Sequence, residues 1–307
     1  MGFNLVRLAI HIRTDDVARL VTMIALSGNR FAELYKTMTC EFSDCECDRC
    51  SHQDSCSWHA LFGQKLSVDT AALKRHQKPP LPFIFSFPMT QFLPGKNYEC
   101  LCDLVVIGSA IPHLGMLLTC FAEMLVHGLD QVSALVIGVF CRDFQGNIQQ
   151  SHGTTVKYSG HTHLLPDNLV IASSDDIVEN STWTSSEMCI RLLSPLKLVE
   201  DGRTVTRFDF ARFARSVMRR VSSLAYYYGE CELEWDFKEM SRLIDDVICT
   251  EQQFRFTTTP VRKLSGITGH GSYLGDFGRL APLLLLGTYV HAGKGATYGM
   301  GAYDISS

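Results

Sequence analysis

The segment at positions 291–301 reads HAGKGATYGMG, and it constrains the fold more than any other stretch of the chain. It closes a region, 266–301, that holds ten of the 23 glycines. Such clustering requires backbone freedom or the close approach of another group to the main chain. The segment carries one cation, Lys294, among many N–H groups, so it could hold backbone phosphates. A Gly-rich hairpin is the alternative.

Two common nucleotide-binding motifs fail in this region. Gly269-His270-Gly271 is followed by Gly275 with one residue too many for a dinucleotide fingerprint. Lys294 lacks the upstream glycine and the downstream serine or threonine of a Walker A loop. The glycine segment therefore does not indicate a mononucleotide or dinucleotide site.

Upstream, apolar periodicity predicts strands alternating with helices. The first half reads as strand, helix, strand, helix, strand, and the polar stretch at 145–182 reads as a connecting insertion. A strand is predicted from Met188, followed by a helix from Asp209, which suits an N-cap, to Gly229, which suits the C-terminal position. Arg212, Arg215 and Arg219 share one stripe of this helix, either a solvated face or one that faces RNA. In the first half, strands are expected at 3–14, 98–108 and 134–142, and helices at 17–28, 30–38 and 112–128.

Several blocks of the chain resemble the CRISPR repeat-processing endoribonucleases of the RAMP superfamily, the sixth CRISPR-associated protein family. The ending 291–301 is similar to the family pattern H-x-G-K-x-[TS]-x-[FY]-G-x-G, with a departure at its middle. The Cys-rich loop also resembles one branch of the family, with Trp58 where that branch has tyrosine. The further matching blocks are Gly266-Ile267-Thr268-Gly269, Leu280-Ala281-Pro282-Leu283, Arg191-Leu192-Leu193-Ser194-Pro195-Leu196, Pro80-Leu81-Pro82-Phe83, Leu93-Pro94-Gly95 and Val126-His127-Gly128-Leu129.

The resemblance implies an α+β fold of two tandem ferredoxin-like, RRM-related domains. The expected boundaries are 1–144 with a Cys-rich insertion at 40–63, a connecting insertion at 145–185, and 186–307 with the Gly-rich loop. It also implies an endoribonuclease that binds CRISPR repeat RNA and cuts precursor crRNA. The cut would use metal-independent attack by the 2′-OH and leave a 2′,3′-cyclic phosphate.

The resemblance places a catalytic histidine on or just after the first helix of the N-terminal domain, often with a tyrosine or lysine nearby. The matching zone, 30–64, offers His59 first and His52 second, with Tyr35 and Lys36 as neighbours. Histidine suits both proton transfers because its ordinary pKa is close to working pH. His291 is a third candidate, with a bracing role equally open. The expected RNA contacts are Gly293, Lys294, Gly295, Tyr298, Gly299, Arg212, Arg215 and Arg219.

Five of the twelve cysteines crowd into positions 40–56 and include a C-x2-C pair, Cys47 and Cys50. In a reduced compartment this spacing favours a structural metal over disulfides. We expect zinc on Cys40, Cys47, Cys50 and Cys56, with Cys45 or His52 as substitutes. Free thiols and an iron–sulfur cluster are the alternatives. No cofactor is expected for catalysis.

Composition agrees with a folded chain and sets limits on its partners. The 307 residues are 46% hydrophobic and carry a formal net charge of −4, so any polyanion site must be local. No secretory signal or membrane-spanning run is predicted, which indicates a cytoplasmic protein with no membrane partner. One alternative is a non-catalytic crRNA-binding subunit of a CRISPR effector complex, whose other subunits would be partners. An unrelated zinc-containing scaffold protein is the second.

Overall fold

The first half of the chain forms a sheet around its first strand, β1 (Asn4–Thr14). In the computed structural model, residues 2–42, 46–76, 78–87, 98–127, 132–143, 145–149, 153–158, 161–166, 169–180 and 182–307 are described. The strand order is β2-β3-β1-β4-β5, all antiparallel, and β8 also pairs with β1. The strands are β2 (Phe83–Ser86), β3 (Glu99–Ile107), β4 (Ala134–Arg142), β5 (Ile148–Gln149) and β8 (Ile171–Ser173).

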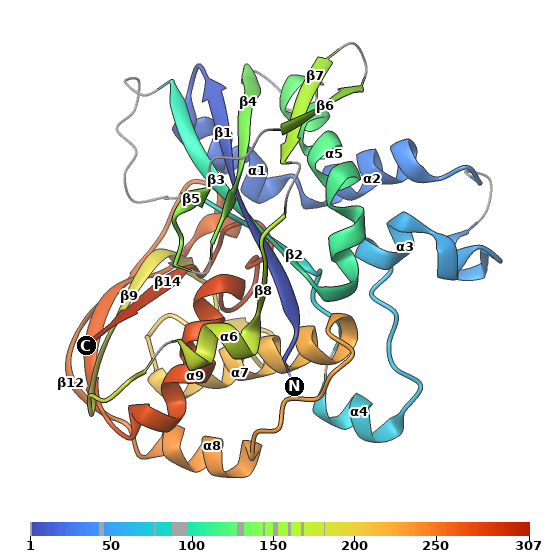
Figure 1. Cartoon of the computed structure of the whole chain (residues 1–307). Helices are drawn as coiled ribbons and strands as arrows, with labels where there is room; N and C mark the ends of the chain where they lie inside the picture. Colours follow the sequence, from blue (N-terminus) through green and yellow to red (C-terminus); the bar gives the residue numbers. More distant parts are fainter. Residues whose placement is uncertain are drawn as a thin grey trace.

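Helices cover one face of this sheet (Figure 1). Side chains alternate between the two faces of a strand, so every second side chain of β1 points toward these helices. Val6, Leu8, Ile10 and Ile12 are fully buried in the first core. The predicted helices at 17–28 and 30–38 and the predicted strands are present within a few residues, whereas α3 and α4 are too short to give a periodic signal. The helices are α1 (Val17–Leu26), α2 (Gly28–Thr39), α3 (Ser57–Phe62), α4 (Thr70–Arg75) and α5 (Leu114–His127).

The segment predicted as a connecting insertion is partly built into this sheet. Within 145–185, β5 extends the sheet beyond β4, and β8 pairs with the start of β1 before α6 (Ser174–Glu179) begins. A separate hairpin joins β6 (Gly153–Tyr158) to β7 (His161–Pro166). These strands are two to six residues long, so alternation along the sequence could not reveal them.

One segment has the composition of a membrane span, although the sequence analysis predicts none. Residues 108–127 are long and apolar enough by length and composition, but more than half of the segment is buried inside the protein. It consists of the 3-10 turn η3 (Gly108–His113) and helix α5, in which Leu117, Phe121 and Leu125 are buried in the first core. The segment therefore has the burial of a core helix.

The second half repeats the same order of elements. It runs β9, α7, α8, β12, β13, α9, β14, and its sheet order β12-β13-β9-β14 matches the order β2-β3-β1-β4 of the first sheet. A small hairpin of β10 (Val199–Glu200) and β11 (Arg203–Thr204) follows β9. The elements are β9 (Glu187–Leu196), α7 (Phe210–Tyr228), α8 (Phe237–Asp245), β12 (Ile248–Thr257), β13 (Gly266–Leu274), α9 (Phe277–Val290) and β14 (Tyr303–Ser306).

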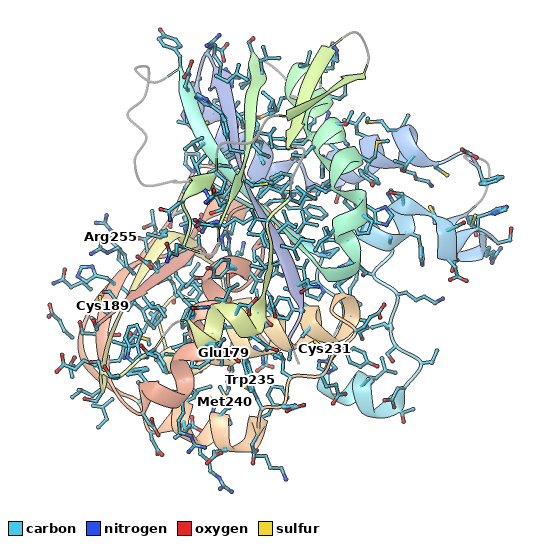
Figure 2. The ribbon with its side chains drawn as sticks, viewed as in Figure 1. Glu179, Cys189, Cys231, Trp235, Met240 and Arg255 are labelled. Atoms are coloured by element: carbon cyan, nitrogen blue, oxygen red, sulfur yellow. The ribbon has the colours of Figure 1, made fainter. Side chains whose placement is uncertain are left out.

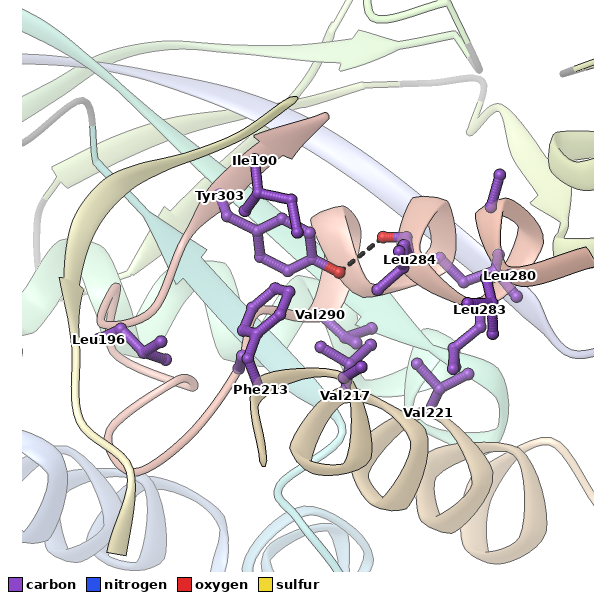
Figure 3. Close-up of a cluster of buried hydrophobic side chains, with 14 of the residues drawn as sticks. Ile190, Leu196, Phe213, Val217, Val221, Leu280, Leu283, Leu284, Val290 and Tyr303 are labelled. Carbon is purple, nitrogen blue, oxygen red and sulfur yellow. Dashed lines mark hydrogen bonds between the residues drawn. The ribbon is translucent and has the colours of Figure 1, made fainter. Parts of the chain in front are cut away.

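Helices α7 and α9 pack against the inner face of the second sheet. Phe213 and Val217 of α7 meet Tyr303 of β14, whose hydroxyl donates to the Leu284 carbonyl oxygen at 2.6 Å (Figure 3). Figure 2 places Cys189 on the outer part of the C-terminal sheet and Cys231 beside the helices. Both are free thiols, as are the other described cysteines.

The two halves interlock at two places. Phe3 and Leu5 at the start of β1 are buried in the second core rather than the first. In the other direction, the glycine loop, residues 291–302, reaches back to β2, where the Phe85 N–H donates to the Thr297 carbonyl oxygen at 2.8 Å. The Tyr298 ring packs against both Phe83 and Phe85, with centroid distances of 6.2 and 6.3 Å.

The glycine loop needs glycine because its backbone has a positive φ at Gly293, Gly295, Gly299 and Gly301, as it has at His291. Gly301 has a φ of 65°, and a Cβ there would collide with the Ala292 carbonyl oxygen. Gly202, in the β10–β11 turn, has a φ of 77° but open space around it. Substitutions at the two positions therefore distinguish the cost of backbone strain from the cost of a steric collision.

We expect Gly301→Ala to destabilise the protein by about 2–4 kcal/mol, because strain and collision add. Gly202→Ala should cost about 1 kcal/mol, because only the strain of positive φ applies. Urea unfolding of both variants beside the wild type checks this. Equal losses would show that the loop relaxes freely around a side chain at 301.

Candidate nucleic-acid interface

A groove of about 940 Å³ lies along α7, between the β10–β11 hairpin and the glycine loop. Seven cations and four carboxylates line it, although the whole chain carries a net charge of −4. The cations are Lys78, Lys197, Arg212, Arg215, Arg219, Arg220 and Lys294, and the carboxylates are Glu200, Asp201, Asp209 and Asp245. The groove is therefore a local positive site on an acidic protein, as a polyanion ligand would require.

Helical spacing places the arginines of α7 on the groove. Asp209 caps the helix by accepting from the Arg212 N–H at 2.8 Å, which fixes where the helix begins. Phe213 and Val217 face the core. Arg212, Arg215 and Arg219, spaced three and four positions apart, lie on another side of the helix and face the groove. The three arginines therefore share one side of α7, as the sequence predicted, and that side faces the glycine loop across the groove.

The groove has one end where charges are paired and one where they are not. Arg212 pairs with Glu200 at 3.0 Å, and Arg215 pairs with Asp245 at 2.6 Å. In the described part of the chain, no carboxylate pairs with Arg219 or Lys294. Of the predicted arginine contacts, Arg219 is therefore the most available to an anion.

The glycine loop presents its lysine to the groove but keeps most of its N–H groups inside the protein. The Lys294 side chain is exposed, whereas its N–H donates to the Lys197 carbonyl oxygen at 2.8 Å. The Gly293 N–H donates to Ser216 Oγ at 3.2 Å, and the Gly301 N–H donates to the Pro195 carbonyl oxygen. A phosphate contact here therefore depends on the ammonium group more than on the amide cradle that the composition indicated.

Tyr298 and Gly299, both predicted to contact RNA, lie where the glycine loop meets the first half. The Tyr298 ring lies between the halves, and its hydroxyl donates to the Gly28 carbonyl oxygen at 3.4 Å. Burial raises the pKa of this phenol well above its ordinary value. Gly299 is buried beside the Phe85 carbonyl oxygen. Both residues connect the loop to the first half, whereas Gly295 stays exposed.

His291 is buried at the end of α9, with 3% of its surface exposed. Burial, reinforced by the Arg220 charge, lowers its pKa to about 3, so the ring is neutral at physiological pH. Its backbone has a φ of 61° where the helix ends, and its N–H donates to the Gly287 carbonyl oxygen. Of the two roles left open by the sequence, the geometry favours bracing of the loop.

The two other predicted histidines differ in exposure. His59 lies on α3, half-buried, with both ring nitrogens enclosed and without a hydrogen-bond partner among the described residues. His52 is exposed and stacks on Phe42 at a ring separation of 4.2 Å. Neither ring is hydrogen-bonded to an orienting group in the described structure, so geometry does not select between them.

His113 was missed by the sequence analysis because no local motif marks it. Its Nδ1 lies 3.0 Å from Ser57 Oγ, and that oxygen lies 2.6 Å from the Tyr35 hydroxyl. Burial lowers the pKa of His113, so the ring is neutral near pH 7 and able to accept a proton. A base oriented by a second group is the arrangement expected of general acid–base catalysis.

The predicted zinc ligands do not converge in the described structure. Cys40, Cys47, Cys50 and Cys56 are half-buried free thiols, and no group of three metal-binding side chains forms among the residues described. The substitute ligand Cys45 lies outside the described residues, as do Leu93-Pro94-Gly95 and the end of the block at 126–129. Zinc on these cysteines therefore stays a prediction.

Sequence-family comparisons match most of the chain in two parts. Residues 190–303 match the model of the CRISPR-associated endoribonuclease Cas6, and residues 3–142 match a model described as an N-terminal domain. No curated protein sequence matches the chain.

Solved structures with the same fold cover the whole chain. A Cas6 (TTHB231) product complex matches 98% of this chain and 100% of its own, at 15% identity and a TM-score of 0.58. Thermus thermophilus Cas6 (TTHB231) matches 100% of both chains, at 13% identity and a TM-score of 0.54. A partial Cas6-RT-Cas1–Cas2 complex matches 99% of this chain and 46% of its own, at 10% identity and a TM-score of 0.57.

The antiparallel α+β architecture is shared with these Cas6 structures. Residues 190–303 match the Cas6 family of CRISPR-associated endoribonucleases, and the whole chain shares the fold of the Cas6 structures.

We expect His291→Asn to flatten the dependence of stability on pH. The pKa of His291 is about 3 when folded and about 6.5 when unfolded, so the unfolded chain takes up the proton first as pH falls. The wild type should therefore lose about 2 kcal/mol through this residue between pH 7 and pH 5. Urea unfolding at both pH values checks this, and equal losses in the two proteins would contradict it.

Proposed function

We propose that this protein binds CRISPR repeat RNA in the groove along α7 and cleaves precursor crRNA without a metal ion. The observation that supports this most is the convergence of Arg219 on α7 with Lys294 of the glycine loop, from distant parts of the chain, on one groove. Two unpaired cations in one groove attract a backbone of phosphates more than a single small anion. The Cas6 relative captured as a product complex agrees with an RNA ligand.

We further propose that the two halves are tandem ferredoxin-like, RRM-related domains. The support is the repeated order β-α-β-β-α-β with the same strand order in both sheets. The proposed boundaries remain near 1–144 and 186–307, and residues 145–185 return to the first sheet through β5 and β8.

The proposed chemistry is attack of a 2′-OH on the adjacent phosphate, with release of the 5′-oxygen and formation of a 2′,3′-cyclic phosphate. The step requires a base for the 2′-OH, a proton donor for the leaving oxygen and positive charge on the phosphate. Lys294 and Arg219 supply charge. His59 and His52 are the proton-transfer candidates from the sequence, and the orientation of His113 by Ser57 adds a third.

A crRNA-holding subunit without catalysis is the second candidate function. It is favoured by the state of the predicted histidines, since His291 is buried and both nitrogens of His59 are enclosed. Other subunits of a CRISPR effector complex would then be partners beside the RNA. We propose a cytoplasmic location for either function.

Cleavage of a labelled repeat RNA should proceed in EDTA and should stop when a 2′-deoxy nucleotide replaces the residue at the cut site. The first result follows from metal independence, and the second from the loss of the nucleophile. His59→Ala, His52→Ala and His113→Ala, assayed side by side, should include one variant that cleaves at least about a hundredfold more slowly while binding is retained.

Tight binding with no cleavage by the wild type would instead support the crRNA-holding subunit. If the 2′-deoxy RNA is cut at the same rate, the proposed mechanism is wrong.

Lys294→Ala should weaken binding to every RNA tested, rather than change which repeat is preferred, because the lysine contacts phosphate. The dependence of log K on log salt should become shallower by about 0.7–0.9, the effect of one lost phosphate contact. Lys238→Ala, which removes an exposed lysine from α8 outside the groove, is the matched control. A change of sequence preference in Lys294→Ala would contradict a phosphate contact.

A further inference from the structure

Arg220 differs from the other cations of the groove in what its guanidinium contacts. It lies on α7 next to Arg219, but it is turned toward the end of α9 and the glycine loop. Its Nε donates to the Val290 carbonyl oxygen at 2.6 Å, and its Nη2 lies 3.5 Å from Thr297 Oγ1. Both acceptors are neutral, so neither balances the positive charge.

No carboxylate balances this charge elsewhere among the described residues. The four acidic side chains of the groove include Glu200 and Asp245, which already pair with Arg212 and Arg215. Burial lowers the pKa of Arg220 to about 10, and the group remains charged at neutral pH. A partly buried cation without an anion is costly for the folded protein, so an anion bound beside it would offset that cost.

The guanidinium retains donors for such a ligand. Arginine has five N–H groups in a planar fork, and the contacts with Val290 and Thr297 use two of them. Arg220 also lines the same groove as Lys294 and Arg219. A phosphate group can accept two parallel hydrogen bonds from a guanidinium, which is the geometry that arginine recognises best.

We propose that Arg220 binds one particular phosphodiester of the RNA at the floor of the groove and thereby fixes the position of the strand against the glycine loop. This inference rests on the proposed function and deepens it, because it separates one defined phosphate contact from the general attraction of the exposed cations. Arg219 and Lys294 hold the strand nearby, whereas the Arg220 side chain is fixed by its own contacts with Val290 and Thr297.

The test is a scan of the repeat RNA in which each phosphate in turn is replaced by an uncharged methylphosphonate. The RNA carries a 2′-deoxy nucleotide at the cut site, so it is bound but not consumed. For the wild type, one linkage should weaken binding roughly tenfold to a hundredfold, as expected for a charged hydrogen-bonded contact. In Arg220→Gln, which keeps a donor for the Val290 carbonyl, binding should be weaker by a similar factor, and that linkage should no longer matter.

Two further variants separate phosphate binding from a structural role. Arg242→Gln removes the same charge from an exposed site on α8 outside the groove, and the wild-type pattern should persist. Arg220→Lys keeps the charge without the planar fork, and the penalty at the sensitive linkage should shrink without vanishing. If Arg220→Gln weakens binding equally at every linkage, or leaves the sensitive linkage unchanged, the proposal is overturned.

The experiment also distinguishes this proposal from the proposed function. If the wild type binds no repeat RNA, the proposed function fails, and inorganic pyrophosphate then tests the anion site alone. Pyrophosphate should raise the thermal unfolding midpoint of the wild type and have no effect on Arg220→Gln. An equal effect on both proteins, or none on either, would overturn the proposal for Arg220.

Discussion

The structure depends on the contact that the glycine loop makes with β2, where the Phe85 N–H donates to the Thr297 carbonyl oxygen. This bond joins the last loop of the second half to an edge strand of the first, and Tyr298 adds an aromatic contact beside it. The groove depends on that attachment, because the same loop carries Lys294 on its other side. Packing between the halves and the position of Lys294 in the groove are thus coupled through a single segment of about ten residues.

The positive charge available to an anion changes along α7, because some of its arginines pair with carboxylates and others do not. At the helix N-terminus the arginines meet carboxylates and gain little net attraction for an anion, whereas near the glycine loop Arg219, Arg220 and Lys294 have no carboxylate partner among the described residues. A protein with a net negative charge can in this way present a local positive site. Charge along a helix therefore indicates a binding site only when the opposing elements are known.

The sequence predicted the elements whose signals are local. The α7 helix has an N-cap at Asp209 and a clean apolar stripe, and the structure confirms both. The roles of Tyr298 and Arg220 were not predictable, since each depends on which distant segment packs beside it, and Arg220 belongs to the same basic run as its exposed neighbour. His113 acquires its partner through a contact 56 positions away, which no spacing rule detects.

The start of β1 gives the arrangement one more consequence. Phe3 and Leu5 belong to the core of the second half, and the glycine loop belongs to the surface of the first, so each half completes the other. A chain divided near position 180 would leave an open apolar surface on both fragments. The two halves share a topology, but neither is an independent module. Recombination could exchange one half only together with the other.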